Sequence, residues 1–233
     1  MNNKKVMLIT GDSRGIGSFL VHYYIEKGYI VIGCSRSNVN ILHNNYRHFI
    51  LDISDEKAVI DMVFKIYRYY KRLDILINNA GIASMNPIIL TPGETVKNIF
   101  YVNFFGTFVI SREASKIMIK QRWGRIINLT TVAVPLCLEG EASYASSKSA
   151  IETFTKILAK ELAPYEITCN AIGPSPIQTD LIKNIPKEKI NNLINKLTIK
   201  RLCKFEDIVN VIDFFIKEES SYITGQVIYL GGV

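Results

Sequence analysis

The sequence predicts an α/β fold, a doubly wound parallel sheet of about seven strands with helices on both faces, in a single domain over residues 1–233. Short apolar runs alternate along the chain with longer segments whose apolar residues recur at helical spacing. The short runs contain few polar residues, as is typical of parallel strands that are covered on both faces. The length of 233 residues and the 48% content of hydrophobic residues suffice for one such core.

Each strand is predicted from one short apolar run, because such a run between turn signals has the length of a buried strand. In order, the runs are VMLIT (6–10), YIVIGC (29–34), HFILDI (48–53), LDILIN (73–78), RIINLT (125–130), EITCNAI (166–172) and QVIYL (226–230). In parallel sheets of this kind, crossovers are right-handed and ligands bind beyond the carboxyl ends of the strands. We therefore expect the functional site at that edge.

Helices are predicted between these runs, where apolar residues recur every three or four positions. Val59, Met62 and Ile66, for example, lie on one face of the second helix. In order, the predicted helices cover residues 16–27, 55–70, 94–122, 143–163 and 206–217.

No targeting or membrane segment is recognised in the sequence. The amino-terminal residues lack the apolar stretch of a secretory signal, and no run of about 18 apolar residues occurs. The four cysteines are widely spaced, without a CxxC pair or a histidine cluster, which favours reduced thiols over a metal site. We expect a cytoplasmic protein with no metal ion and no membrane attachment.

The formal net charge is +7. Such an excess fits an acidic partner, such as nucleic acid, an acidic carrier protein or a phosphorylated substrate, and it equally fits a solvated basic surface. The basic residues are scattered, without a nucleic-acid recognition motif or an alternation of basic and aromatic residues. A nucleic-acid partner is therefore not expected.

A glycine-rich turn, TGDSRGIG (10–17), links the first predicted strand to the first predicted helix. Its glycines let the backbone approach a pyrophosphate, and the helix N-terminus supplies free N–H groups and a partial positive charge. This strand–turn–helix context is the one that a dinucleotide site requires, although a tight turn without a ligand has the same glycines. The predicted contacts here are Gly11, Ser13, Arg14, Gly15, Ile16 and Gly17.

The form of the dinucleotide is predicted from the end of the second strand, which reads Cys34-Ser35-Arg36. A site for NAD usually has an acidic residue here that binds the ribose 2′-hydroxyl, and none is present. Arg36 and Arg14 could instead hold a 2′-phosphate by charge-assisted hydrogen bonds, the alternative being two exposed arginines without a ligand. We predict NADP(H) as the cofactor.

The segment YASSK places Tyr144 and Lys148 four residues apart, on one face of a predicted helix. A free phenol has a pKa near 10, which is too high for efficient proton exchange at neutral pH. A partly desolvated ammonium group a few ångströms away could lower that pKa by about 3 units. Tyrosine–lysine pairs are also common on helix surfaces, so the surrounding motifs must decide between the two interpretations.

Those motifs form an ordered set. They are TGDSRGIG (10–17), Asp52, NNAG (78–81), Asn103 within YVNFFGTF, YASSK (144–148), NAIGPSPIQTD (170–180), RLCKFEDI (201–208) and YITGQVIYLGG (222–232). In this order and spacing they resemble the classical short-chain dehydrogenase/reductases over essentially the whole chain, and the 3-oxoacyl-[acyl-carrier-protein] reductases most closely. The resemblance implies a Rossmann-type sheet and hydride transfer between a nicotinamide and a carbonyl or alcohol.

The resemblance also implies roles for single residues. Tyr144 is similar to the general acid/base, Lys148 to the group that holds the nicotinamide ribose and lowers the tyrosine pKa, and Asn103 to the residue that positions a relay water. Cofactor contacts are implied for Tyr144 and Lys148, for Asp52 and Ile53 at the adenine, for Asn79, Ala80 and Gly81 beside the adenosine half, and for Pro174, Ile177 and Thr179 at the nicotinamide carboxamide.

The sequence departs from the family pattern at two places near the expected site. Thirteen residues before Tyr144 the family has a serine that orients the substrate oxygen, and here Thr131 stands at that position, beside Thr130. Threonine keeps the hydroxyl, so we predict that Thr131 takes the serine's role, the alternative being a strand-end threonine without a catalytic part. Pro174-Ser175 replaces the usual Pro-Gly, so we expect a different loop path there.

The prediction is therefore an NADPH-dependent reductase of a ketone. The substrate is either a 3-oxoacyl thioester on acyl carrier protein or a sugar, nucleotide-sugar or secondary-metabolite carbonyl, and a cofactor-binding subunit without catalysis is a further alternative. For the carrier, Arg122 matches one of the family's two basic positions, whereas Tyr165-Glu166 occupies the other. The resemblance implies a homotetramer, or a homodimer, packed through 94–122 and 143–163, and we expect 181–200 to form the substrate lid.

Overall fold

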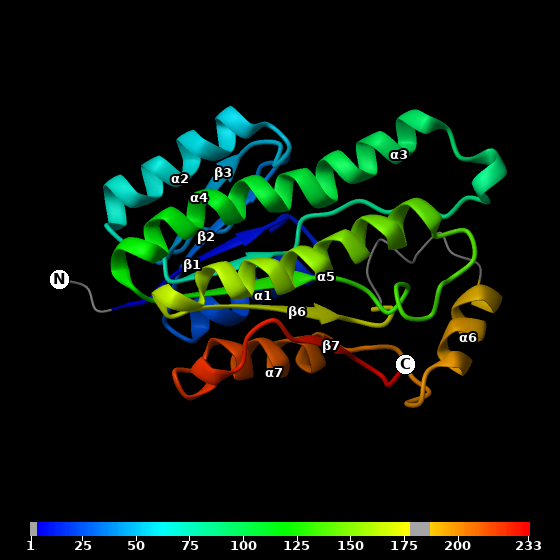
Figure 1. Ribbon diagram of the computed structural model, residues 1–233. Helices are drawn as coiled ribbons and strands as arrows, with labels where there is room; N and C mark the ends of the chain where they lie inside the picture. Colours follow the sequence, from blue (N-terminus) through cyan, green and yellow to red (C-terminus); the bar gives the residue numbers. More distant parts are fainter. Residues whose placement is uncertain (1–3, 178–186) are drawn as a thin grey trace.

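The computed structural model describes residues 4–177 and 187–233 of the chain. Among them, seven strands form one all-parallel sheet in the order β3-β2-β1-β4-β5-β6-β7 (Figure 1). The winding reverses at β1, which pairs with both β2 and β4. The strands are β1 (Val6–Thr10), β2 (Ile30–Ser35), β3 (Tyr46–Ile50), β4 (Ile75–Asn78), β5 (Gly124–Leu129), β6 (Ile167–Gly173) and β7 (Val227–Tyr229). The predicted Rossmann-type fold is confirmed.

The helices connect successive strands. They are α1 (Gly15–Glu26), α2 (Glu56–Tyr70), α3 (Gly93–Phe100), α4 (Gly106–Gln121), α5 (Ala142–Leu162), α6 (Lys187–Lys196) and α7 (Phe205–Ile216). Short helical turns add η1 (Ile88–Leu90), η2 (Tyr101–Phe105), η3 (Ala163–Tyr165) and η4 (Glu219–Tyr222). Within the described ranges, no helix is both long enough and apolar enough to cross a membrane.

Two apolar clusters cover the two faces of the sheet. Helices α2, α4 and α5 pack on one face, and α1 and α7 pack on the other (Figure 1). Within β1, Leu8 belongs to the first cluster, whereas Met7 and Ile9 belong to the second. Side chains of a strand alternate between faces, so a strand covered on both sides must be apolar throughout. This explains the short apolar runs of the sequence.

The third strand ends earlier than predicted. The prediction extended it over 48–53, whereas β3 ends at Ile50 and Asp52 begins a turn. The Asp52 carboxylate accepts hydrogen bonds from the backbone N–H and the hydroxyl of Ser54, at 2.9 and 2.6 Å. Asp55 then caps α2, because its side chain accepts from the Ala58 N–H at 3.1 Å. Asp52 and Ile53 therefore lie on a loop at the carboxyl edge of the sheet.

The predicted helix over 94–122 is not continuous. A π-helical turn, η2, separates α3 from α4 and contains Asn103. The Asn103 side chain accepts from the Ile82 N–H at 2.8 Å and donates to the Ile82 carbonyl at 2.9 Å. A π turn holds one residue more than an α turn, and such turns often accompany functional sites. The predicted lid, 181–200, is described only from residue 187 onward, where α6 occupies most of it.

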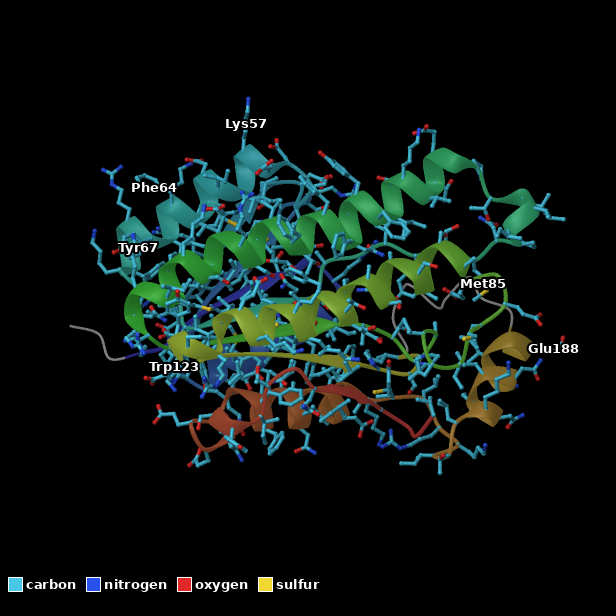
Figure 2. All side chains as sticks on the ribbon, viewed as in Figure 1. Lys57, Phe64, Tyr67, Met85, Trp123 and Glu188 are labelled. Atoms are coloured by element: carbon cyan, nitrogen blue, oxygen red, sulfur yellow. The ribbon has the colours of Figure 1, made fainter. Side chains whose placement is uncertain are left out.

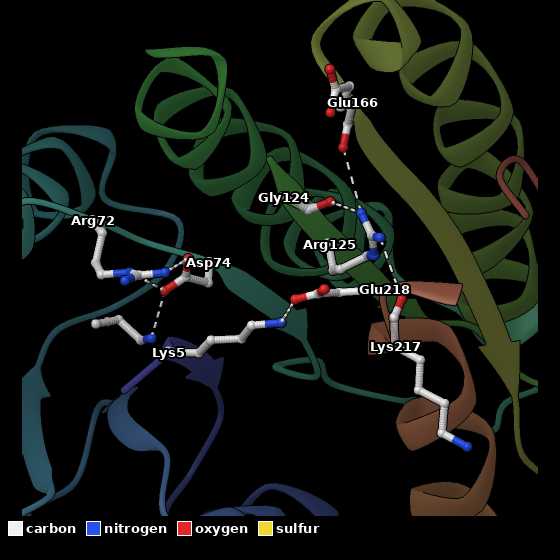
Figure 3. Close-up of polar contacts among 9 residues, drawn as sticks. Lys5, Arg72, Asp74, Gly124, Arg125, Glu166, Lys217 and Glu218 are labelled. Carbon is white, nitrogen blue, oxygen red and sulfur yellow. Dashed lines mark hydrogen bonds and ion pairs between the residues drawn. The ribbon is translucent and has the colours of Figure 1, made fainter. Parts of the chain in front are cut away.

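At the amino-terminal edge of the sheet, a buried carboxylate joins β1 to the start of β4 (Figure 3). Asp74 is 2% exposed and accepts two hydrogen bonds from Arg72, both at 2.7 Å. The same side chain accepts from the Val6 N–H at 2.7 Å. Figure 2 places Trp123 at this end of the molecule and Met85 and Glu188 at the opposite end. Polar contacts thus fix the sheet at the edge away from the expected site.

Candidate active site

The loops that follow β1 and β4 are in direct contact. A Cβ on Gly11 would lie 2.9 Å from the Ala80 Cα, and Gly11 has a φ of +71°, which other residues rarely adopt. The Thr10 hydroxyl accepts from the N–H groups of Asn79 and Ala80, at 3.0 and 2.9 Å. The Asn79 amide donates back to the carbonyls of Thr10 and Gly11. These bonds fix the glycine-rich turn against the end of β4.

A cavity of about 510 Å³ opens beside this turn. The predicted cofactor residues that line it are Gly11, Ser13, Arg14, Ile16, Arg36, Asp52, Ile53, Asn79, Ala80 and Gly81. Helix α1 begins here at Gly15, and the side chain of its N-cap, Arg14, makes no capping bond, so the free N–H groups of the first turn remain for an anion. The cavity therefore fits the phosphate-bearing part of a dinucleotide.

Gly17 supports the turn from within the fold. A Cβ there would lie 2.1 Å from the Gly11 carbonyl oxygen, so any larger residue would displace the turn. The lining of the cavity does not include Gly15, Gly17, Tyr144, Lys148, Pro174 or Ile177. Their predicted contacts with a cofactor remain predictions.

Arg36 faces the cavity from the loop after β2. Its guanidinium lies 3.9 Å from the Asp52 carboxylate, and its side chain is 68% exposed. Burial opposes ionisation of Asp52, but hydrogen bonds from Ser54 and the charge of Arg36 outweigh it and keep the pKa of Asp52 below its usual value. An exposed arginine held by one long ion pair can rearrange to bind another anion.

Tyr144 and Thr131 meet at the carboxyl edge of the sheet. The Thr131 hydroxyl lies near the Tyr144 phenol, whose pKa it lowers, and it accepts from the Ala133 N–H at 3.2 Å. Burial, and then the nearby Glu141 carboxylate, raise the pKa of Tyr144 to about 12, while the Thr131 hydroxyl acts in the opposite direction. Tyr144 is therefore a protonated phenol at neutral pH in this structure.

The neighbouring Thr130 is engaged elsewhere. Its hydroxyl donates to the Glu152 carboxylate at 2.6 Å, and the Tyr229 hydroxyl donates to the other oxygen of the same carboxylate at 2.8 Å. Of the two adjacent threonines, Thr131 is the one that lowers the pKa of Tyr144, and its predicted catalytic role remains a prediction.

Lys148 lies one turn after Tyr144 on α5 and is 4% exposed. Its ammonium group donates to the Leu129 carbonyl at 2.7 Å and lies 6.0 Å from the centre of the Tyr144 ring. Burial lowers the pKa of Lys148 to about 8. Lys148 is not among the groups that shift the pKa of Tyr144 in this structure, so the lowering of that pKa by the lysine remains a prediction.

Asn103 and Lys148 approach the loop after β4 from two helical segments. A Cβ on Gly81 would lie 3.2 Å from the Asn103 Oδ1 and 3.5 Å from the Lys148 Nζ. The Asn103 amide also donates to the Ser147 hydroxyl at 3.0 Å, which ties η2 to α5. The structure thus brings Asn103, Thr131, Tyr144 and Lys148 to one end of the sheet.

The loop after β6 carries the predicted nicotinamide contacts. The Pro174 carbonyl accepts from the Val132 N–H at 3.3 Å, which joins this loop to the strand end at Thr131. Ile177 pairs with Cys203, while Thr179 lies outside the described residues. Ser175 is 4% exposed and is not among the residues with a positive φ, so serine causes no backbone strain in place of glycine.

Two buried carboxyl groups near the site were not predicted. Glu141 is 8% exposed, its Oε2 has no hydrogen-bond partner among the described residues, and burial raises its pKa. Asp12, within the glycine-rich turn, is fully buried. The sequence could have indicated Asp12, because it places an acidic residue between the glycines of this turn.

A scan of family models matches residues 5–190 to the short chain dehydrogenases. The chain belongs to the short-chain dehydrogenase family. It is 34% identical over 235 residues to the 3-oxoacyl-[acyl-carrier-protein] reductase FabG of Buchnera aphidicola, with 98% of this chain and 96% of that protein covered. The predicted family is confirmed.

Solved structures of this fold contain both forms of the cofactor. ElxO with NADP bound superposes with a TM-score of 0.90, at 29% identity over 97% of each chain. A short-chain dehydrogenase from Leptospira borgpetersenii with NAD⁺ bound gives a TM-score of 0.91, at 30% identity over 98% of this chain and 92% of that one. This short-chain dehydrogenase is thus an oxidoreductase with a nicotinamide cofactor.

Proposed function

We propose that this short-chain dehydrogenase is an NADPH-dependent reductase of a ketone, and that its substrate is a 3-oxoacyl thioester carried by acyl carrier protein. The observation that carries the proposal is a buried, protonated Tyr144 with the Thr131 hydroxyl near it and the buried Lys148 side chain 6.0 Å from the centre of its ring. A phenol that retains its proton at neutral pH is suited to donate it to the oxygen of a ketone as that oxygen gains negative charge.

Bound NADPH supplies the hydride. Tyr144 donates a proton to the carbonyl oxygen, and the Thr131 hydroxyl donates a hydrogen bond that stabilises the developing negative charge. Lys148 would add a positive charge close to this oxygen and would hold the ribose of the bound cofactor. Asn103 fixes the backbone at Ile82 and the Ser147 hydroxyl, so that the loop after β4 and helix α5 keep their positions during the reaction.

The choice of NADPH over NADH is supported by Arg36 and Arg14. Both line the cavity beside the first turn of α1. A 2′-phosphate would be held by two charge-assisted pairs at that place, and Asp52 would then be partly released from Arg36. The protein with bound NADP among the solved structures has the same fold.

The carrier-bound substrate is supported by the name of the Buchnera relative. Arg122, the predicted contact with the carrier, has an exposed guanidinium that lies 3.8 Å from the Glu166 carboxylate and donates to the Pro164 carbonyl. The carrier reductases have a second basic position just before β6. Tyr165 and Glu166 stand there in this chain, so one of the two basic contacts is missing. The homotetramer that we propose would pack through α4 and α5, where Phe108 and Ile157 are exposed.

The test is NADPH oxidation with a 3-oxoacyl thioester, compared with nucleotide-linked and simple keto sugars, for the wild-type protein and for Tyr144→Phe. The thioester should be reduced fastest, and Tyr144→Phe should lose at least about a thousandfold in kcat while it still binds NADPH. A faster reaction with a sugar would reject the substrate. Equal rates in the two proteins would reject the mechanism.

A further inference from the structure

A carboxylate lies buried behind the glycine-rich turn. Asp12 is fully buried, and a Cβ placed on Gly33 of β2 would fall 1.7 Å from its Oδ2. Only glycine at position 33 therefore leaves room for this side chain. The Oδ2 atom accepts hydrogen bonds from the Tyr46 hydroxyl and from the His48 Nδ1, the latter at 2.8 Å. Both donors belong to β3, so the turn after β1 is connected to the edge strand.

His48 extends this connection to the loop that carries Arg36. Its Nε2 lies 3.0 Å from the Ser37 carbonyl, and its side chain is 8% exposed. The Ser35 hydroxyl donates to the same carbonyl at 3.1 Å. One continuous set of hydrogen bonds thus leads from Asp12 through His48 to the residue next to Arg36. We call Asp12, Tyr46 and His48 the brace.

The imidazole of His48 bridges two acceptors. Its Nδ1 faces the Asp12 carboxylate and its Nε2 faces the Ser37 carbonyl. The other titratable groups near Asp12 are Tyr46 and Cys34. Burial raises the pKa of both, and the negative charge of Asp12 raises each further, so they stay neutral. His48 is therefore the group that links the buried carboxylate to the Ser35–Ser37 loop.

Two features indicate that the brace does more than fill the core. The Oδ1 of Asp12 has no hydrogen-bond partner within the part of the chain that the structure describes, although it is buried. Leaving such an atom unpaired costs about 1 to 3 kcal/mol, so the side chain is not the most stable choice at this place. The loop that the brace holds, Ser35–Ser37, also lines the cofactor cavity.

We propose that Asp12 and His48 are positioning residues that hold the Ser35–Ser37 loop and thereby place Arg36 for the 2′-phosphate of the cofactor. This rests on the NADPH preference proposed above. Asp12, Tyr46 and His48 are not among the residues that line the cavity beside the glycine-rich turn. Loss of the brace should therefore weaken binding of the phosphorylated dinucleotide and spare the form without the 2′-phosphate.

The first experiment measures dissociation constants for NADPH and for NADH with the wild-type protein, His48→Gln and Tyr46→Phe. His22→Gln is the control, because His22 is an exposed histidine on α1. We expect His48→Gln to weaken NADPH binding by about tenfold, which is the loss of one charge-assisted hydrogen bond, and NADH binding by less than about twofold. Equal changes for both cofactors, or no change, would overturn the proposal.

The second experiment compares the two donors to Asp12, since a purely structural role would affect both variants alike. Tyr46→Phe removes one donor and leaves His48 in place. It should weaken NADPH binding less than His48→Gln does, because only His48 continues from Asp12 to the Ser37 carbonyl. Equal losses of NADPH affinity in the two variants would show that the link to Ser37 has no part in binding and would overturn the proposal.

The third experiment separates the brace from the cofactor preference. Amide hydrogen exchange of residues 36–39 is measured without cofactor, and it should be faster in His48→Gln than in the wild type and the control. Arg36→Ala tests the preference alone. If Arg36→Ala leaves NADPH binding unchanged while exchange still accelerates, the preference fails and the brace stands. Unchanged exchange in His48→Gln rejects the brace.

Discussion

Lys148 and Tyr144 lie one helical turn apart, yet the Lys148 ammonium donates to the Leu129 carbonyl and lies 6.0 Å from the centre of the tyrosine ring. Burial therefore dominates the acid–base behaviour of both groups. It lowers the pKa of Lys148 to about 8 and raises that of Tyr144 to about 12. The free protein thus has a neutral phenol next to a buried lysine whose pKa lies close to neutral pH.

The first prediction concerns the stability cost of this cation. The pKa of Lys148 falls from 10.5 in the unfolded chain to about 8 in the folded protein. Between these values the unfolded chain binds more protons, so stability should rise as the pH increases from 8 toward 10.5. Lys148→Met should abolish activity and raise the free energy of unfolding at pH 7 by about 2 to 3 kcal/mol, as measured by urea denaturation.

The control for this measurement is Lys156→Met, on an exposed position of the same helix. It should leave the free energy of unfolding within about 0.5 kcal/mol of the wild type. A Lys148→Met protein that is less stable than the wild type at pH 7 would contradict the burial cost inferred here.

The second prediction concerns Glu141. Its carboxylate raises the pKa of Tyr144, so Glu141→Gln should lower that pKa. Oxidation of the alcohol requires the phenolate, and the rise of kcat/KM with pH in that direction should therefore occur at lower pH in the variant. Glu139→Gln, two residues away and exposed, should leave the profile in place. A profile that does not move in Glu141→Gln would mean that this carboxyl is already neutral when the enzyme turns over.

The third prediction distinguishes the two adjacent threonines. Thr131→Ala removes the hydroxyl that lowers the pKa of Tyr144 and should reduce kcat by about a hundredfold, whereas Thr131→Ser should retain most of the activity. Thr130→Ser keeps the donor to Glu152 and should behave like the wild type. Steady-state rates with one ketone measure these effects. If Thr131→Ala kept as high a kcat as Thr131→Ser, the Thr131 hydroxyl would have no part in the mechanism.

The fourth prediction concerns the amino-terminal edge of the sheet. Asp74→Ala leaves Arg72 and the Val6 N–H without their acceptor and should lower the free energy of unfolding by about 3 kcal/mol. Asp61→Ala breaks an exposed pair with Lys65 on α2 and should cost less than about 0.5 kcal/mol. Equal losses in the two variants, measured in urea, would show that burial of Asp74 does not matter.

The positions of Tyr144, Lys148 and Thr131 could be predicted because they depend on local geometry. Helical spacing places Tyr144 and Lys148 on one face, and the strand that ends at Leu129 delivers Thr131 to the edge where ligands bind. The alternation of apolar strands with helices likewise determined the order of the elements. These features need no knowledge of how distant segments meet.

The brace and the π-helical turn could not be predicted in this way. Tyr46 and His48 are two positions apart and therefore lie on the same face of β3. Their contact with Asp12, however, depends on the register that pairs His48 with Gly33. The widened turn depends on the bonds between Asn103 and Ile82, which are far apart in the sequence. The effect of burial and of Glu141 on the pKa of Tyr144 could not be predicted either, because both are properties of the folded chain.

The extra residue of the π-helical turn η2 makes it possible to separate folding of the protein from its catalytic activity. Excising a single amino acid between Tyr101 and Phe105 would merge α3 and α4 into one regular helix. The residues of α3 would then rotate by about 100° about the helix axis relative to α4. The strands of the sheet and the apolar layers on its two faces would stay intact. Shortening the chain by one position would thus yield a folded protein without catalytic activity.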